Sequence, residues 1–277
     1  MRYLVAVSGG VDSVVLLHKL VSSGEHELLV AHFDHGIRPE SDADARFVEG
    51  LAKYYGLTFE MRREEMGSHA SEALARERRY TFLHEMAGAH GATIVTAHHA
   101  DDAVETIAIN LLRGTGWRGL AVLDTPAVVR PLLSLTKRDI YDYALTHQLE
   151  WAEDETNATD AYLRNRLRRR IRVSLTDEAI ATLLELRENQ INLKHAITHE
   201  EHAIIGDSRQ YSRYLFTHVD VIVATELLRY LTNHGITRPQ AERALHAIKT
   251  MQAGATTDIG GGITLRFSQR EFTIQTP

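Results

Sequence analysis

The chain contains 277 residues, of which 44% are hydrophobic and 25% charged, a composition typical of a globular protein. Its net charge of −6 does not indicate a general nucleic-acid binder, and the absence of cysteine excludes a disulfide framework, a cysteine zinc site, an iron–sulfur cluster and a catalytic thiol. No apolar run reaches the roughly 18 residues of a membrane span, and the apolar start at Tyr3–Val7 is too short for a signal peptide. We therefore expect a cytoplasmic protein that makes no membrane contact.

Short apolar runs alternate with helical patterns in the first half of the chain. The predicted strands cover Tyr3–Val7, Glu27–Phe33, Thr58–Arg62, Ala92–Thr96 and Ala127–Arg130. The predicted helices cover Ser13–Ser22, Ser41–Tyr55, Ser71–His90, Asp101–Arg113 and Lys137–His147. Strands that alternate with helices predict a mostly parallel sheet, and such sheets bind ligands beyond the carboxyl ends of their strands.

The second half of the chain has a different pattern. It predicts a basic helix at Ala161–Arg172, a long helix from Thr176 to Ile205, and shorter helices at Val219–His234 and Pro239–Gln252. Small antiparallel strands are expected at Thr256–Ile259, Ile263–Phe267 and Phe272–Gln275. We therefore predict an α/β domain of residues 1–175 with a parallel, Rossmann-like sheet, and a smaller, mainly helical domain of residues 176–277 that ends in short strands.

The hexapeptide Ser8-Gly9-Gly10-Val11-Asp12-Ser13 follows the first predicted strand and opens the first helix. Glycines let an anion approach the backbone, a helix N-terminus offers N–H groups and partial positive charge, and the serines add hydroxyl donors. The hexapeptide has no Gly-Lys-Ser/Thr, so it is not a Walker A loop. Asp12 would repel a phosphate unless a cation lies between them, and Mg²⁺ suits that position. A glycine-rich turn without a ligand is the alternative.

Two further blocks place polar side chains where a ligand could meet them. His32 and Asp34 lie at the end of the second predicted strand, although a plain polar turn would also explain them. Arg76, Arg79 and Tyr80 share one face of a predicted helix. Arginines there could hold phosphate or carboxylate oxygens, and a solvated charged face is the alternative.

The block from Thr96 to Thr106 leads from a strand into a helix and carries two histidines and three carboxylates. Asp102 and Glu105 share a helix face, and His98 lies one turn before Asp102. The helix dipole favours acidic residues at a helix start without any function, but a cluster of this size also suits a Mg²⁺ site or proton transfer.

The phosphate loop resembles that of the N-type ATP pyrophosphatases, the PP-loop superfamily, which cleave ATP between the α- and β-phosphates and form adenylated intermediates. Together with the histidine–aspartate block of Thr96–Thr106, Arg130-Pro131-Leu132-Leu133 and Asn165-Arg166, this loop makes the first 172 residues or so resemble the tRNA(Ile)-lysidine synthetase family. Two residues depart from the pattern of that family. Ala103 stands where glutamine is usual, and Glu155 where proline or serine is common.

The resemblance implies an adenine nucleotide alpha hydrolase-like fold and a carbon–nitrogen ligase that uses ATP and Mg²⁺. ATP would adenylate the wobble cytidine of the CAU anticodon of tRNA(Ile), releasing pyrophosphate, and L-lysine would displace AMP to form lysidine. The implied ATP-binding residues are Ser8, Gly9, Gly10, Val11, Asp12, Ser13 and His32. The implied catalytic residues are Asp12, Asp102, His98, Arg76 and Arg79, with Asp12 and Asp102 also as metal ligands and Asp34 and Glu105 as candidates for binding lysine.

Six of the nine residues from Arg164 to Arg172 are arginine. Because this run follows the predicted catalytic domain, we expect it to bind the tRNA backbone; a solvated basic helix paired with the acidic remainder is the alternative. The residues expected to contact tRNA are Arg164, Arg166, Arg168, Arg169 and Arg172.

Two other functions remain as alternatives. Another PP-loop tRNA-modifying enzyme, such as a 2-thiocytidine synthase, is disfavoured because sulfur transfer relies on cysteines and this chain has none. A non-catalytic RNA-binding protein with a vestigial nucleotide site should have lost glycines or aspartates that are all retained here. The sequence leaves the oligomeric state open, a homodimer included.

Overall fold

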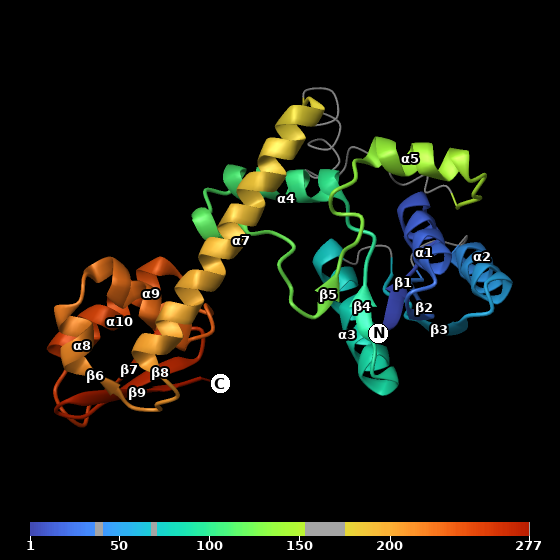
Figure 1. The fold of residues 1–277 in the computed structure, drawn as a ribbon. Helices are drawn as coiled ribbons and strands as arrows, with labels where there is room; N and C mark the ends of the chain where they lie inside the picture. The colour runs from blue at the N-terminus through green and yellow to red at the C-terminus, as the bar shows by residue number, and fades with distance from the viewer. Residues whose placement is uncertain (37–40, 68–70, 153–174, 277) are drawn as a thin grey trace. The chain divides into compact units, whose positions relative to one another are not determined.

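The computed structural model describes residues 1–36, 41–67, 71–152 and 175–276 (Figure 1). Contacts divide the chain into two compact units, Met1–Ile191 and Asn192–Pro277. The basic helix expected at residues 161–172, with all of its arginines, lies outside the described residues.

The first unit is built on a parallel five-stranded sheet with the order β3-β2-β1-β4-β5. Its strands are β1 (Arg2–Ala6), β2 (Glu27–Asp34), β3 (Thr58–Arg63), β4 (Thr93–Val95) and β5 (Val128–Val129). The helices between them are α1 (Val11–Ser23), α2 (Ser41–Tyr54), α3 (Glu72–His90), α4 (Ala100–Leu112) and α5 (Lys137–Thr146). This arrangement confirms the predicted Rossmann-like α/β fold.

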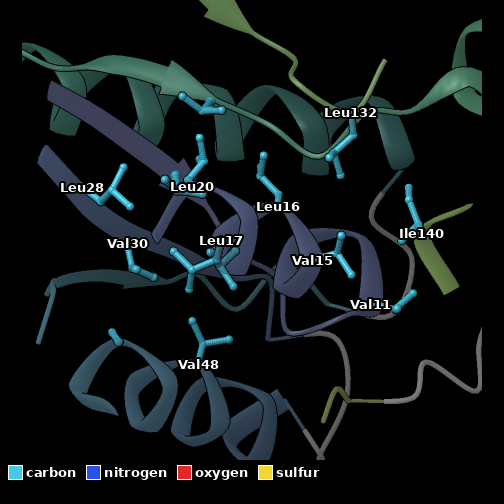
Figure 2. Close-up of a cluster of buried hydrophobic side chains, with 14 of the residues drawn as sticks. Val11, Val15, Leu16, Leu17, Leu20, Leu28, Val30, Val48, Leu132 and Ile140 are labelled. Carbon is cyan, nitrogen blue, oxygen red and sulfur yellow. The ribbon is translucent and has the colours of Figure 1, made fainter. Parts of the chain in front are cut away.

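The alternation of side chains along the strands separates two apolar cores. Val5 of β1 packs in a cluster with α1, α2 and α5, whereas its neighbour Leu4 packs in a cluster with α3. Figure 2 shows the first cluster, in which Val15 of α1 and Ile140 of α5 point into the same core. Burial of these side chains fixes where α1 and α5 lie, and hence where their N-termini lie.

The strand order places a topological switch between β1 and β4. Both strands pair in parallel, but the chain continues from β1 toward β2 on one side and from β4 toward β5 on the other. The loops that follow β1 and β4 therefore diverge at the same edge of the sheet, which is where open α/β sheets bind ligands. The hexapeptide of residues 8–13 follows β1, and the histidine–aspartate block follows β4.

The first part of α7 (Asp177–Ile205) belongs to the first unit. Its Leu183 and Leu184 pack against Ala103 and Ile107 of α4 in a small core near the 3-10 helix η1 (Trp117–Leu120). This packing accounts for an alanine at position 103, because Ala103 is fully buried among apolar side chains.

The second unit combines helices with an antiparallel sheet of order β6-β9-β8-β7. Its core contains Phe216, Leu245 and Leu265, all at or below 4% exposure. Its elements after α7 are β6 (Tyr211–Ser212), α8 (Arg213–His218), α9 (Val221–Leu231), α10 (Arg238–Thr250), β7 (Thr256–Gly260), β8 (Ile263–Phe267) and β9 (Glu271–Gln275).

Most predicted elements are confirmed to within a few residues, and the differences are short elements. Neither β6 nor α8 was expected from the sequence, and the predicted strand Ala127–Arg130 is reduced to the two residues of β5. In the part of the chain that the structure describes, no helix combines the length and apolar character required to cross a membrane.

Candidate active site

The loop after β1 forms a compact turn held by its own hydroxyls. Ser13 Oγ donates to the carbonyl of Gly10 at 2.8 Å and accepts from the backbone N–H of Ser8 at 3.2 Å. Gly9 has a φ of +95°, which favours glycine, and Val11 turns its side chain into the core (Figure 2). Of the predicted ATP-binding residues, Ser13 is thus engaged in the loop itself, and Val11 would contribute only its backbone.

Gly10 is a glycine that the fold does not require. It caps α1 with extended backbone angles, and a methyl group added there would meet no atom closer than 3.7 Å, the Oγ of Ser8. Since neither backbone strain nor crowding explains the glycine, close approach of a ligand to the backbone would. The first N–H groups of α1 have no partners within the helix and suit an anion.

Acidic and basic side chains meet in front of this loop in a group that we name the carboxylate half, comprising Asp12, His99, Asp101, Asp102 and Lys137. Lys137 Nζ lies 2.5 Å from Asp12 Oδ1. His99 lies between the carboxylates, with its Nε2 3.9 Å from Asp12 Oδ1 and 3.5 Å from Asp102 Oδ2, and its Nδ1 3.4 Å from Asp101 Oδ2.

The helix caps set the geometry of the carboxylate half. His99 caps α4, and its backbone N–H donates to Asp102 Oδ2 at 3.1 Å. Lys137 is the first residue of α5, where Thr136 and Asp139 form a capping box. The backbone N–H of Lys137 donates to Asp101 Oδ2 at 2.8 Å, which ties the start of α5 to the start of α4.

The charges of this half shift its pKa values. Burial alone would lower the pKa of His99, but the hydrogen bond to Asp101 and the charges of Asp102 and Asp12 outweigh burial and raise it. Burial would raise the pKa of Asp101, yet His99 and the backbone N–H of Lys137 hold it below its usual value. The carboxylate half therefore favours positive charge.

A second group, which we name the arginine half, comprises Arg76, Arg79, Tyr80, His98 and Arg130. The guanidinium carbons of Arg76 and Arg79 lie 4.8 and 5.8 Å from the centre of the Tyr80 ring. Arg130 follows β5, donates from Nη1 to the carbonyl of Val128 at 3.0 Å, and also interacts with Tyr80. The charges of these three arginines, two from α3 and one after β5, also act on His98.

His98 is neutral in this setting. Burial and, to a smaller extent, the charges of Arg76, Arg130 and Arg79 together lower its pKa to about 4, against the opposing effect of Asp102. Its Nδ1 lies 2.8 Å from Thr96 Oγ1, so Nε2 is the nitrogen that can meet a substrate. Burial together with Arg76 and Arg187 also lowers the pKa of Arg130, against the effect of Tyr80.

The remaining predicted residues occupy buried positions on β2 and α4. The Nδ1 of His32 lies 2.8 Å from the carbonyl of Val7, which links β2 to the start of the phosphate loop. Asp34 accepts from the backbone N–H of Gly36 at 2.9 Å and lies 3.3 Å from Arg63 Nη1. Glu105 is 2% exposed on α4. Their roles toward ATP and lysine stay predictions.

The residues fit a divalent cation only with help from a ligand. Among the residues described, no group of three or more histidine, aspartate or glutamate side chains is arranged to hold a metal ion. A Mg²⁺ ion beside Asp12 would therefore take most of its oxygen ligands from phosphates and water, which is its usual habit in phosphate-binding proteins.

Sequence reasoning missed Lys137 and gave no individual role to His99 or Arg130. The one available signal for Lys137 was the start of a capped helix after Arg130-Pro131-Leu132-Leu133. That signal locates the helix but does not say that its first side chain reaches Asp12, 125 positions away in the sequence.

The chain is similar in sequence to curated tRNA(Ile)-lysidine synthases. A tRNA(Ile)-lysidine synthase from Exiguobacterium sibiricum is 43% identical over 174 residues, covering 61% of this chain and 42% of that protein. One from Solibacter usitatus is 36% identical over 255 residues, covering 90% of this chain and 57% of that protein. The chain thus spans about half the length of these relatives.

A solved structure supports the fold. The U34-tRNA thiolase NcsA from Methanococcus maripaludis has a TM-score of 0.59 and 13% identity, over 69% of this chain and 72% of that one. The family model of the PP-loop domain matches residues 1–175, which carry the phosphate loop and both halves of the site. The chain belongs to the PP-loop domain family.

Proposed function

We propose that the protein is a tRNA(Ile)-lysidine synthetase, which uses ATP and Mg²⁺ to join L-lysine to the wobble cytidine of the CAU anticodon of tRNA(Ile). The observation that carries the proposal is the meeting of the phosphate loop, the carboxylate half and the arginine half at one switch point of the sheet. Among the reactions of the PP-loop family we propose this one because the chain is similar to relatives named tRNA(Ile)-lysidine synthase.

The first step forms a bond between the cytidine carbonyl oxygen and the α-phosphorus of ATP, and the bond to pyrophosphate breaks. The backbone of Gly9 and Gly10 and the N-terminus of α1 would hold the leaving pyrophosphate. Mg²⁺, when bound beside Asp12, would supply positive charge to these phosphates. Arg76 and Arg79 would stabilise the negative charge that develops on the α-phosphate.

In the second step, an amine of lysine bonds to the activated ring carbon, the bond to AMP breaks, and the nitrogen releases a proton. A neutral His98 does not repel the incoming amine, and Asp102 next to both histidines can stabilise the positive charge on the attacking nitrogen. Asp34 and Glu105 are the proposed partners of the remaining ammonium group of lysine.

The proposal extends to the rest of the chain. Residues 1–175 would form the catalytic domain and residues 176–277 a second domain. The arginines from Arg164 to Arg172 would bind the tRNA backbone. A thiolase reaction that depends on an iron–sulfur cluster is disfavoured, because this chain offers no cysteine to hold one.

The test is a reaction with ATP, Mg²⁺, labelled L-lysine and a tRNA(Ile) transcript bearing CAU, followed by nucleoside analysis. We expect lysidine, with one AMP and one pyrophosphate released for each lysine incorporated. A transcript with uridine at the wobble position is the matched control and should give no product. Pyrophosphate release without lysine incorporation would indicate another PP-loop reaction, and no pyrophosphate release would indicate a non-catalytic protein.

A further inference from the structure

The phosphate loop has no lysine of its own, yet a lysine stands directly in front of it. Lys137 Nζ lies 2.5 Å from Asp12 Oδ1, and the two side chains are 15% and 32% exposed. Asp12 is in the first turn of α1, two positions after Gly10. The loop itself has no positively charged side chain, and the first residue of α5 places one beside it.

The position of Lys137 does not depend on its ion pair. The start of α5 is fixed by the Thr136–Asp139 capping box and by the bond from the Lys137 N–H to Asp101. One turn further on, Ile140 is fully buried, and Figure 2 shows it in the same core as Val11 of α1. The core therefore holds the base of Lys137 beside the N-terminus of α1, whichever partner its ammonium group has.

The side chain itself has alternative partners. Its Nζ lies 5.0 Å from the centre of the Tyr141 ring as well as beside Asp12. A lysine carries a compact charge on a flexible stem, so its ammonium group can move between acceptors while its backbone stays in place. A polyphosphate on the loop would offer acceptors with more negative charge than one carboxylate.

We propose that Lys137 is the phosphate-binding lysine of this loop. It neutralises Asp12 in the ligand-free protein, and it binds the β- and γ-phosphate oxygens of ATP when a divalent cation takes its place on Asp12. The inference rests on the proposed use of ATP, and it assigns to α5 a binding role that Walker A proteins place within the loop itself. Lys137 binds the leaving group and not the adenosine or the α-phosphate.

The test is the affinity of Lys137→Met for three ligands, measured by calorimetry in the presence of Mg²⁺ without tRNA or lysine. We expect affinity for ATP and for inorganic pyrophosphate to fall about tenfold to a hundredfold, the range for one charge-assisted hydrogen bond. Affinity for AMP should change less than twofold. Arg138→Met is the matched control, because Arg138 is the next residue on α5, is 83% exposed and pairs only weakly with Asp142 at 3.9 Å. It should leave all three affinities unchanged.

A second variant separates binding from folding. Lys137→Arg keeps the charge and should retain most of the affinity for pyrophosphate, and the melting temperature of each variant is measured alongside. An equal loss for AMP and ATP, or no loss for pyrophosphate, would overturn the assignment and leave Lys137 a structural partner of Asp12. If lysidine is not formed but the loss remains specific for pyrophosphate, the proposed function fails while the role of Lys137 stands.

Discussion

The two halves of the candidate site contain adjacent histidines, His98 and His99, whose pKa values are shifted in opposite directions. His99 is held between three carboxylates, which raise its pKa, whereas partial burial and the charges of three arginines lower the pKa of His98 to about 4. Both histidines follow the same short strand, β4. Position along the chain therefore says little about their chemistry, and the charges brought by α1, α3, α4 and the residue after β5 set the two pKa values apart.

The difference between the halves suits adenylyl transfer, in which a metal ion brings positive charge and the transferred phosphate develops negative charge. The carboxylate half favours cations, as expected where polyphosphate and a metal ion are bound together. The arginine half favours anions, as expected where charge develops on the transferred phosphate. Neighbouring titratable groups whose pKa values are pushed apart are a known mark of acid–base sites. The following substitutions and titrations test whether the two halves bind opposite charges.

The largest effect is expected from Asp12→Ala. Removing this carboxylate takes away the partner of Lys137 and the proposed metal ligand together, so pyrophosphate release should fall by about a hundredfold or more. Asp142→Ala is the control, since Asp142 is 69% exposed on α5 and its carboxylate lies 3.9 Å from Arg138. If Asp12→Ala releases pyrophosphate at a rate within about tenfold of the unsubstituted protein, a difference of about 1.4 kcal/mol in the barrier, Asp12 is not a metal ligand.

A smaller but more selective effect is expected in the arginine half. Arg76→Ala should lower the turnover number about tenfold to a hundredfold and change the affinity for ATP less than threefold, because the charge that Arg76 would stabilise develops only in the transition state. Arg78→Ala provides a matched control on the same helix, where Arg78 is 54% exposed and lies 4.0 Å from Glu64. Equal effects of the two variants on turnover would show that only the net charge of α3 matters.

The sequence was sufficient for the sheet and for most of the residues at its edge. Alternating strands and helices predicted the parallel sheet, and polar blocks after the first and fourth strands predicted which side chains meet there. It did not reveal the opposite states of His98 and His99, because the arginines that lower the pKa of His98 come from distant elements. Nor did it reveal β6 and α8, since a strand of two residues and a helix of six are too short for a hydrophobic period.

The most direct comparison of the two halves is an NMR titration of the two histidines. It measures pKa shifts, which are smaller effects than the changes in rate above. His98 should stay neutral down to a pH of about 4, while His99 should remain protonated above the usual histidine pKa. The signals can be assigned with His98→Gln and His99→Gln. Two histidines that titrate together would contradict the division into halves.

The two pKa shifts should also make the free energy of unfolding depend on pH, in opposite directions for His99 and His98. His99 has a raised pKa in the folded state, so its contribution is complete below the unfolded pKa and is lost as the pH rises through the folded value. His99→Gln should therefore destabilise the protein more at pH 5.5 than at pH 9, as measured by chemical denaturation at the two pH values. His98 has a lowered pKa, so the folded protein loses stability as the pH falls from the unfolded value toward about 4, and His98→Gln should reduce that loss.

Single substitutions in each half should move one histidine and not the other. Arg76→Ala removes a charge that lowers the pKa of His98, so that pKa should rise while that of His99 stays in place. Asp101→Asn removes the hydrogen-bonding carboxylate that raises the pKa of His99, so that pKa should fall while that of His98 stays in place. Asp102 acts on both histidines, and Asp102→Asn should lower both pKa values. If Arg76→Ala moved both values by the same amount, the two halves would form a single electrostatic unit, and the assignment of separate sets of charges to His98 and His99 would be wrong.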